Sequence, residues 1–226
     1  TKVVYFNLDS ALKKYTFIKA DSGKLHNDSI ALAAFYEKLF QLKTTGKGKV
    51  NVVHIGDSHI QADFFSGTVR KKLHKDFGSS GRGLIFPYRV ANTNGPPDYR
   101  IVSNKEWKSK RNVFPDKPLP IGISGITIET EDTTAYITVT IKDSSGIDYS
   151  TTKLILFHGK NPDNFNWAVI TDSADGAKCF FPAQNDSTSF TSEYFFDHPI
   201  HKFTLKCIAG DSTKTCDYIF GMSLEN

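Results

Sequence analysis

The feature that most constrains the fold is a series of short apolar segments in the second half of the 226-residue chain. Each segment alternates polar and apolar residues or is β-branched, and Gly, Asn, Asp or Ser residues separate it from the next. The segments are GITIET, TAYITVTI, TKLILFHG, NWAVITD, HKFTLKCI and CDYIFGMSL. Strands of this length and spacing, without a helical stripe between them, are typical of a β-sandwich or jelly roll. We therefore predict an all-β domain over residues 105–226.

The first half of the chain has helical periodicity instead. One apolar stripe recurs at three- and four-residue spacing, and it consists of Leu32, Phe35, Tyr36, Leu39 and Leu42. Asn27 or Asp28 can cap this helix, and Gly46 lies just past its end. Residues 50–55 (VNVVHI) are typical of a buried strand. A second helix then carries an apolar residue every fourth position from Phe65 to Phe77, and Gly78 ends it. This order predicts a partial α/β unit over residues 1–104.

Composition excludes several classes of function. The 28 basic and 24 acidic residues are dispersed along the chain and give a net charge of +4, so nucleic acid is not an expected partner. No apolar run approaches the roughly 18 residues of a membrane span. No motif points to a cofactor, and Asp197, His198 and His201 are too weak a pattern to predict a metal. The sequence gives no indication of the oligomeric state.

The tetrapeptide GDSH, residues 56–59, places a serine between the expected strand and the second helix. Ser58 would present its hydroxyl and its amide at the helix start, where the backbone favours negative charge. Gly56 permits a sharp turn, and Asp57 can hold that turn through hydrogen bonds to its amides. The simpler interpretation is that Asp57 and Ser58 only cap the helix.

HIGDSHIQAD, followed by FGSSGRGLIFPYR, resembles the first conserved block of the SGNH (GDSL) hydrolases. It is most similar to the branch with an inserted β-domain that contains peptidoglycan O-acetylesterases. The resemblance implies a flavodoxin-like, three-layer α/β fold, with Ser58 as the nucleophile and an oxyanion amide, supported by Asp57 and Gly56. The further crevice candidates are His59, Asp63, Gly81 and Gly83. The implied substrate is an ester-bearing carbohydrate or another small acyl ester, and the implied location is periplasmic, secreted or cell-surface, after removal of a signal peptide.

The sequence departs from the family pattern in its later blocks. It contains no convincing GxND, and no aspartate precedes a histidine by three residues; Asp197 and His201 have the wrong spacing. We expect the missing oxyanion donors and the Asp/His pair beyond residue 226. The chain is therefore expected to be an N-terminal fragment that is almost inert as an esterase.

An alternative hypothesis is a non-enzymatic module that binds a glycan or another partner through the all-β domain. Four aromatic residues are candidates for stacking on sugar, although aromatic residues in sandwiches more often belong to the core: Trp107, Phe165, Trp167 and Tyr194. Cys207 and Cys216 flank a turn-like AGDST segment. A hairpin there would place them opposite each other, either as a cross-strand disulfide or as two free thiols.

Overall fold

The computed structural model describes residues 8–17, 19, 28–143, 146–173, 176–208 and 213–226. The chain divides into two compact units, residues 1–50 and residues 51–226. None of the described helices is both long enough and apolar enough to cross a lipid bilayer.

The first unit contains three helices, α1 (Leu8–Lys14), α2 (Asp28–Ala31) and α3 (Ala33–Thr45). Helix α3 confirms the first predicted helix, and Gly46 ends it in the left-handed conformation (φ 66°) with its N–H bonded to the Leu42 carbonyl. The predicted start is wrong, because Asp28 begins the separate helix α2 and α3 begins only after Leu32. The other proposed cap, Asn27, lies outside the described residues.

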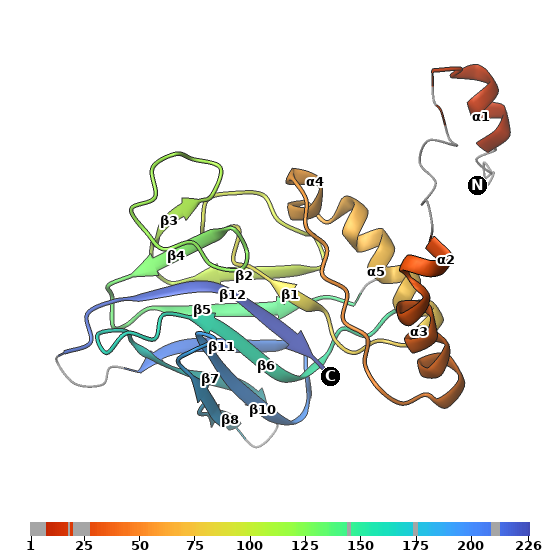
Figure 1. Ribbon diagram of the computed structural model, residues 1–226. Helices are drawn as coiled ribbons and strands as arrows, with labels where there is room; N and C mark the ends of the chain where they lie inside the picture. Colours follow the sequence, from red (N-terminus) through yellow and green to blue (C-terminus); the bar gives the residue numbers. More distant parts are fainter. Residues whose placement is uncertain (1–7, 18, 20–27, 144–145, 174–175, 209–212) are drawn as a thin grey trace, which may run out of the picture. The chain divides into compact units, whose positions relative to one another are not determined.

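The second unit contains two antiparallel sheets, which confirm the predicted β-sandwich (Figure 1). The first sheet has the order β3-β4-β12-β6-β10-β9, with β1 also paired to β12. Its strands are β1 (Gly83–Ile85), β3 (Lys108–Arg111), β4 (Ile126–Thr130), β6 (Thr151–His158), β9 (Gln184–Asp186), β10 (Thr191–Ile200) and β12 (Asp217–Glu225). The second sheet has the order β2-β5-β11-β7-β8. Its strands are β2 (Tyr99–Ser103), β5 (Tyr136–Ile141), β7 (Asn166–Ser173), β8 (Gly176–Phe180) and β11 (Lys202–Ile208).

All six predicted strand segments form strands, namely β4, β5, β6, β7, β11 and β12. Their alternation explains the core, because every second side chain of a strand points to the same face of its sheet. In β5 the buried residues are Ile137, Val139 and Ile141, and in β11 they include Phe203 and Leu205. Strands β1 and β2 also belong to these sheets although they precede residue 105.

The predicted strand over residues 50–55 is wrong. This segment has no regular secondary structure, and Val53 and Ile55 are 83% and 88% exposed. A strand needs a neighbour for its backbone N–H and C=O groups, and none of the described strands pairs with this segment. The structure therefore does not show the predicted partial α/β unit among the described residues. The second predicted helix is confirmed as α5 (Phe64–Phe77), which follows the short helix α4 (Ser58–Gln61).

The predicted hairpin that joins Cys207 to Cys216 is also wrong. Strand β11 belongs to the second sheet, whereas β12 belongs to the first, so the two strands do not pair. Cys207, Cys216 and Cys179 are all free thiols. Burial raises the pKa of the Cys207 thiol to about 11, which keeps it protonated at neutral pH.

Candidate functional site

Ser58 is the first residue of α4, and Asp57 is the N-cap of this helix. The Asp57 Oδ1 atom accepts a hydrogen bond from the His59 backbone N–H (2.9 Å) and lies 3.0 Å from His59 Nδ1. These contacts, the backbone bond first, lower the pKa of the exposed Asp57 carboxyl. The capping role expected from the simpler interpretation is therefore present, while Ser58 itself is exposed.

The turn before Ser58 requires a glycine. A Cβ atom on Gly56 would lie 2.7 Å from Ile60 Cγ1, closer than real Cβ contacts allow. Within the described part of the chain, no histidine is hydrogen-bonded to the Ser58 hydroxyl, because the His59 ring is directed to Asp57. Ser58 is thus exposed at the start of a short helix that, among the described residues, follows no strand.

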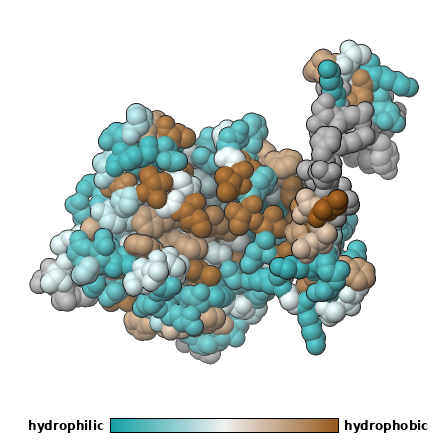
Figure 2. Space-filling model, in the orientation of Figure 1, coloured by the Kyte–Doolittle hydropathy of each residue, from teal (hydrophilic) through white to brown (hydrophobic). Residues whose placement is uncertain are grey.

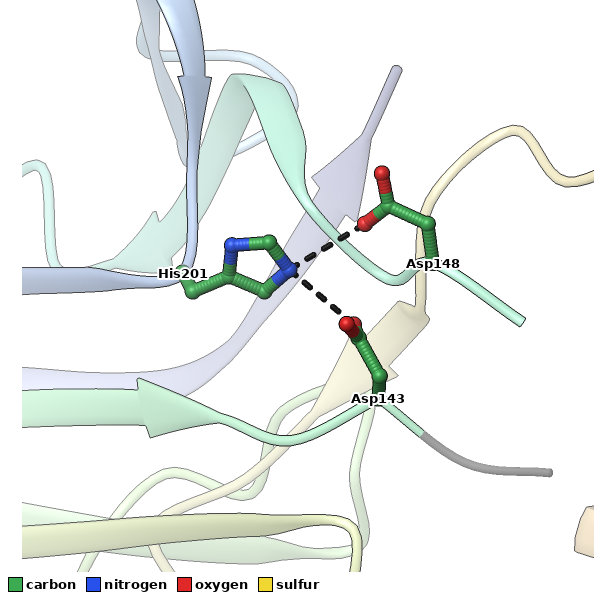
Figure 3. A group of neighbouring side chains, drawn as sticks. All are labelled: Asp143, Asp148 and His201. Carbon is green, nitrogen blue, oxygen red and sulfur yellow. Dashed lines mark hydrogen bonds and ion pairs between the residues drawn. The ribbon is translucent and has the colours of Figure 1, made fainter. Parts of the chain in front are cut away.

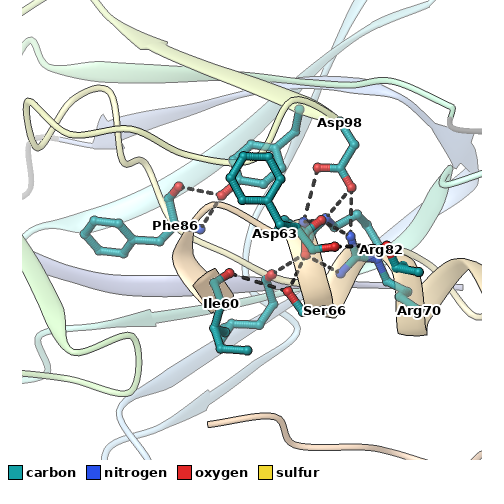
Figure 4. A network of polar contacts seen from close by, with 11 residues as sticks. Ile60, Asp63, Ser66, Arg70, Arg82, Phe86 and Asp98 are labelled. Carbon is teal, nitrogen blue, oxygen red and sulfur yellow. Dashed lines mark hydrogen bonds and ion pairs between the residues drawn. The ribbon is translucent and has the colours of Figure 1, made fainter. Parts of the chain in front are cut away.

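Asp63 belongs to a buried ion-pair network (Figure 4). Its carboxylate contacts Arg70 and Arg82 (Arg82 Nη2 to Oδ2, 3.1 Å), and both arginines also contact Asp98 at 3.1 Å. Burial opposes ionisation of Asp63, but the two arginines outweigh it and lower its pKa. The network attaches α5 to the residue that precedes β1.

The two glycine candidates have structural roles. Gly81 and Gly83 adopt positive φ angles of 95° and 78°, which glycine tolerates best. A Cβ atom on Gly81 would lie 2.5 Å from the Leu224 carbonyl oxygen, so this position lies against β12. Gly81 therefore fits closely against the sandwich, whereas Gly83 has open space around its Cα and begins β1, paired with Leu224.

A separate pocket of about 380 Å³ lies at one end of the sandwich and is named the His158 pocket below. Its lining comes from β6, β7, β9, β10, β11 and the loops beside them: His158, Lys160, Asn166, Trp167, Phe181, Pro182, Asn185, Ser192 and Ile208. It combines apolar rings with amide, imidazole, hydroxyl and ammonium groups. A concave site with a few convergent polar groups is the usual form of a small-ligand site.

A buried polar network forms the floor of this pocket. His158 Nδ1 lies 3.0 Å from Asp217 Oδ2, and His158 Nε2 lies 2.8 Å from Ser192 Oγ. The Trp167 indole N–H, from the opposite sheet, also donates to Asp217. Burial raises the pKa of Asp217, although its hydrogen bonds with His158 and Trp167 act in the opposite direction.

The Ser192–His158–Asp217 order resembles a nucleophilic triad, but the serine is fully engaged. Ser192 Oγ also contacts Lys160 Nζ (2.5 Å) and Asn185 Oδ1 (2.6 Å), and the residue is 1% exposed. An activated serine needs a free approach for a carbonyl carbon and donors for the oxyanion. We therefore interpret the network as a rigid support that positions Lys160 and Asn185.

The chain segment between His158 and Lys160 is set by close packing. A Cβ atom on Gly159 would lie 2.3 Å from Asn164 Oδ1 and 2.5 Å from Asp217 Oδ1, so only glycine fits. His158, the last residue of β6, therefore lies in the network, and Lys160, two residues later, lines the pocket. Lys160 is half-buried, and loss of water around its ammonium group lowers its pKa.

Two other groups of charged residues are less suited to an organic ligand. An open depression of about 520 Å³ is lined mainly by acidic residues, and its Lys108 is 2.5 Å from Glu131. A second group comprises Asp143, Asp148 and His201, in which His201 Nε2 lies 3.0 and 3.1 Å from the two carboxylates (Figure 3). All three are exposed, and Asp197 pairs with Lys178 rather than with His201.

The aromatic candidates named from the sequence are in the core. Trp107, Phe165, Trp167 and Tyr194 are between 0% and 6% exposed. The exposed ring at the pocket is Phe181 (64% exposed), which the sequence analysis missed. Its signal was the Phe-Phe-Pro sequence at 180–182, where β8 ends and the short connection to β9 begins. Lys160, Asn185 and Ser192 were also missed, because only the sheet order brings them together.

Comparisons with known proteins show only distant likenesses. No family model matches the chain, and no curated protein matches it. Among solved structures, the family 32 carbohydrate-binding module of C. perfringens NanJ, in complex with galactose, has a TM-score of 0.37 at 10% identity and covers 64% of this chain and 98% of that one. The catalytic domain of a GH87 α-1,3-glucanase, in complex with nigerose, has a TM-score of 0.30 at 12% identity and covers 65% of this chain and 29% of that one. Likenesses this weak do not decide what this chain binds.

Proposed function

We propose that the β-sandwich binds carbohydrate in the His158 pocket. The observation that carries the proposal is the exposed Phe181 ring beside Lys160 and Asn185 in one concavity. A sugar ring has an apolar face of C–H groups and a rim of hydroxyls. An aromatic ring can pack on the first, and fixed donors and acceptors can bind the second.

The support beneath these groups favours recognition over catalysis. Lys160 Nζ lies 3.0 Å from Asn185 Oδ1, and both contact Ser192, which His158 holds from below. Groups fixed before the ligand arrives lose little conformational entropy on binding. The pocket is therefore preorganised for a ligand with several hydrogen-bonding groups.

The test is calorimetric titration of the chain with mono- and oligosaccharides, using Phe181→Ala and the matched control Phe114→Ala. Phe114 is also exposed (49%) but does not line the pocket. We expect Phe181→Ala to weaken binding about 10-fold or more, since a stacking contact contributes about 0.5–1.5 kcal/mol beyond area burial. Equal binding by both variants would contradict the assignment of this pocket.

We propose as a second function that Ser58 is the nucleophile of an SGNH-type serine esterase, as the resemblance implies. The specific observation is the exposed Ser58 at the start of α4, flanked by apolar side chains without cover. Val53, Ile55, Phe64 and Phe65 are 60–88% exposed. Figure 2 shows brown, hydrophobic surface on the face in view, close to where Figure 1 places α4. A further sheet packed on these residues would supply the missing strand partner and a wall for the crevice.

This second proposal requires a general base and oxyanion donors from another segment of protein. We expect this chain alone to hydrolyse p-nitrophenyl acetate no faster than its Ser58→Ala variant. The same chain joined to a segment that supplies an Asp-x-x-His pair should hydrolyse the ester, and Ser58→Ala should abolish that activity. Full activity of Ser58→Ala in this joined chain would refute the role of Ser58 and would leave the sugar-binding proposal unaffected.

A further inference from the structure

Lys160 is a cation in the His158 pocket without a carboxylate partner among the described residues. Its ammonium group contacts only neutral atoms there, Asn185 Oδ1 (3.0 Å) and Ser192 Oγ (2.5 Å). Other lysines of the sandwich surface behave differently: Lys178 and Lys202, for example, form ion pairs with Asp197 and Asp172. The charge of Lys160 is thus uncompensated by any direct contact.

The two carboxylates that influence Lys160 electrostatically are already engaged elsewhere. Asp217 accepts hydrogen bonds from the Trp167 indole and from the Tyr218 backbone N–H (2.7 Å), and it contacts His158. Asp186 accepts from the Ser189 hydroxyl (2.7 Å) and the Thr188 backbone N–H (2.8 Å). Neither is within ion-pair distance of Lys160, so the ammonium remains available to a ligand anion.

We infer that the His158 pocket selects a carboxylate-bearing sugar, such as a uronic acid residue, over its neutral counterpart. This inference rests on the proposed carbohydrate binding and names the class of sugar. Lys160 would bind the carboxylate, Asn185 and Asn166 would bind ring hydroxyls, and Phe181 would pack on the apolar face. A charge-assisted hydrogen bond that a half-buried ammonium group donates to a carboxylate is stronger than a bond between neutral groups. A neutral sugar would leave this cation partly desolvated and without an anion.

The experiment compares binding of galacturonic and glucuronic acid oligosaccharides with binding of their galactose and glucose counterparts. The proteins are the whole chain and its Lys160→Met, Lys160→Arg and Lys202→Met variants. Methionine keeps most of the length of the lysine side chain but removes its charge. Lys202→Met is the matched control, because Lys202 lies at the opposite end of β11 from the pocket residue Ile208.

We expect the whole chain to bind the acidic sugars about 10-fold more tightly than the neutral ones at moderate salt. Lys160→Met should abolish this preference, so that acidic and neutral sugars bind within about 2-fold of each other. Lys160→Arg should retain part of the preference, and Lys202→Met all of it. Circular dichroism should show the same folded state for each variant.

The possible failures are distinguishable. Binding of neutral sugars with no preference for acidic ones would overturn the inference and leave the proposed function standing. An acidic preference that survives in Lys160→Met would also overturn it, because another cation would then be responsible. Binding of neither class would contradict both the inference and the proposed function. Equal preference for a sulfated sugar would reassign the selection from carboxylates to anions in general, which contradicts the sugar class named here.

Discussion

The sandwich core and residues 51–65 are both rich in apolar side chains, but these side chains are buried only in the core. Leu154, Leu156 and Val169 are 0% exposed, whereas Val53 and Ile55 are almost fully exposed. In the sandwich, each apolar strand finds neighbours that satisfy its backbone and a facing sheet that covers its side chains. Residues 51–55 have neither. An apolar, β-branched run is therefore not sufficient for a strand, because the strand also needs a partner.

The attachment of α5 differs in kind from the packing of the sandwich. Strands of the two sheets meet through apolar side chains, while α5 is fixed through the ion pairs that Asp63 and Arg70 form with Arg82 and Asp98. Such a network fixes the position of a helix. Its net contribution to the free energy of unfolding is small, but removing one of its members is strongly destabilising. The predictions that follow test this contrast.

The largest expected effect is that of Asp63→Ala. The substitution leaves the buried Arg70 and Arg82 without one of their two carboxylates, which should reduce the free energy of unfolding by about 3–5 kcal/mol. Urea denaturation followed by circular dichroism measures the change. The control is Asp57→Ala, because the Asp57 contacts are exposed and its loss should have a much smaller effect. A small loss for Asp63→Ala would show that α5 is held mainly by apolar packing.

A slightly smaller effect is expected for Leu156→Ala in β6. This substitution should reduce the free energy of unfolding by about 2–5 kcal/mol. A fully buried leucine side chain loses buried apolar surface when it is shortened to alanine, and a cavity remains. The matched variant Val53→Ala should change the free energy of unfolding by less than about 0.5 kcal/mol, since this side chain is 83% exposed. Comparable losses for the two variants would mean that residues 51–55 are covered in solution, and the contrast between the two regions would disappear.

The smallest expected effect is on the acid dependence of stability. The pKa of Asp63 in the folded protein lies below its ordinary value of 3.8, so the folded state binds this proton less readily than the unfolded state does. The stabilisation is therefore complete above about pH 4 and is lost as the pH falls through the lowered folded value. Unfolding free energies between pH 6 and pH 2.5 should decline less steeply for Asp63→Asn than for the unaltered chain. Identical slopes would show that other carboxyls dominate the acid response.

Local sequence patterns predicted elements well wherever periodicity alone decides the structure. The stripe from Leu32 to Leu42 identified α3, the four-residue spacing from Phe65 identified α5, and six alternating segments identified strands. Predictions failed where the structure depends on residues far apart in the sequence. Cys207 and Cys216 seemed adjacent across a turn, but their strands join different sheets.

The candidate site shows the same limit. Asp57 was identified as a capping residue because a cap depends only on neighbouring residues. The ion-pair network of Asp63 was not identified, because its partner Arg82 comes close only in the folded chain. The His158 pocket depends on residues from β6, β9 and β10, so no spacing pattern could reveal it. Lys160 directly follows one predicted strand, whereas Phe181 lies outside all six, so no shared pattern links the two residues.

The position of β12 has a consequence for how the protein is made. This strand pairs with β1 and β4 on one side and with β6 on the other, so the first sheet cannot close before residues 217–225 have been synthesised. During translation, no strand would lie between β4 and β6, so the edges that β12 later covers would remain unpaired. Such long-range pairing slows folding and exposes apolar strands to other chains. A nascent chain stalled before residue 217 is therefore expected to depend strongly on chaperones for its solubility.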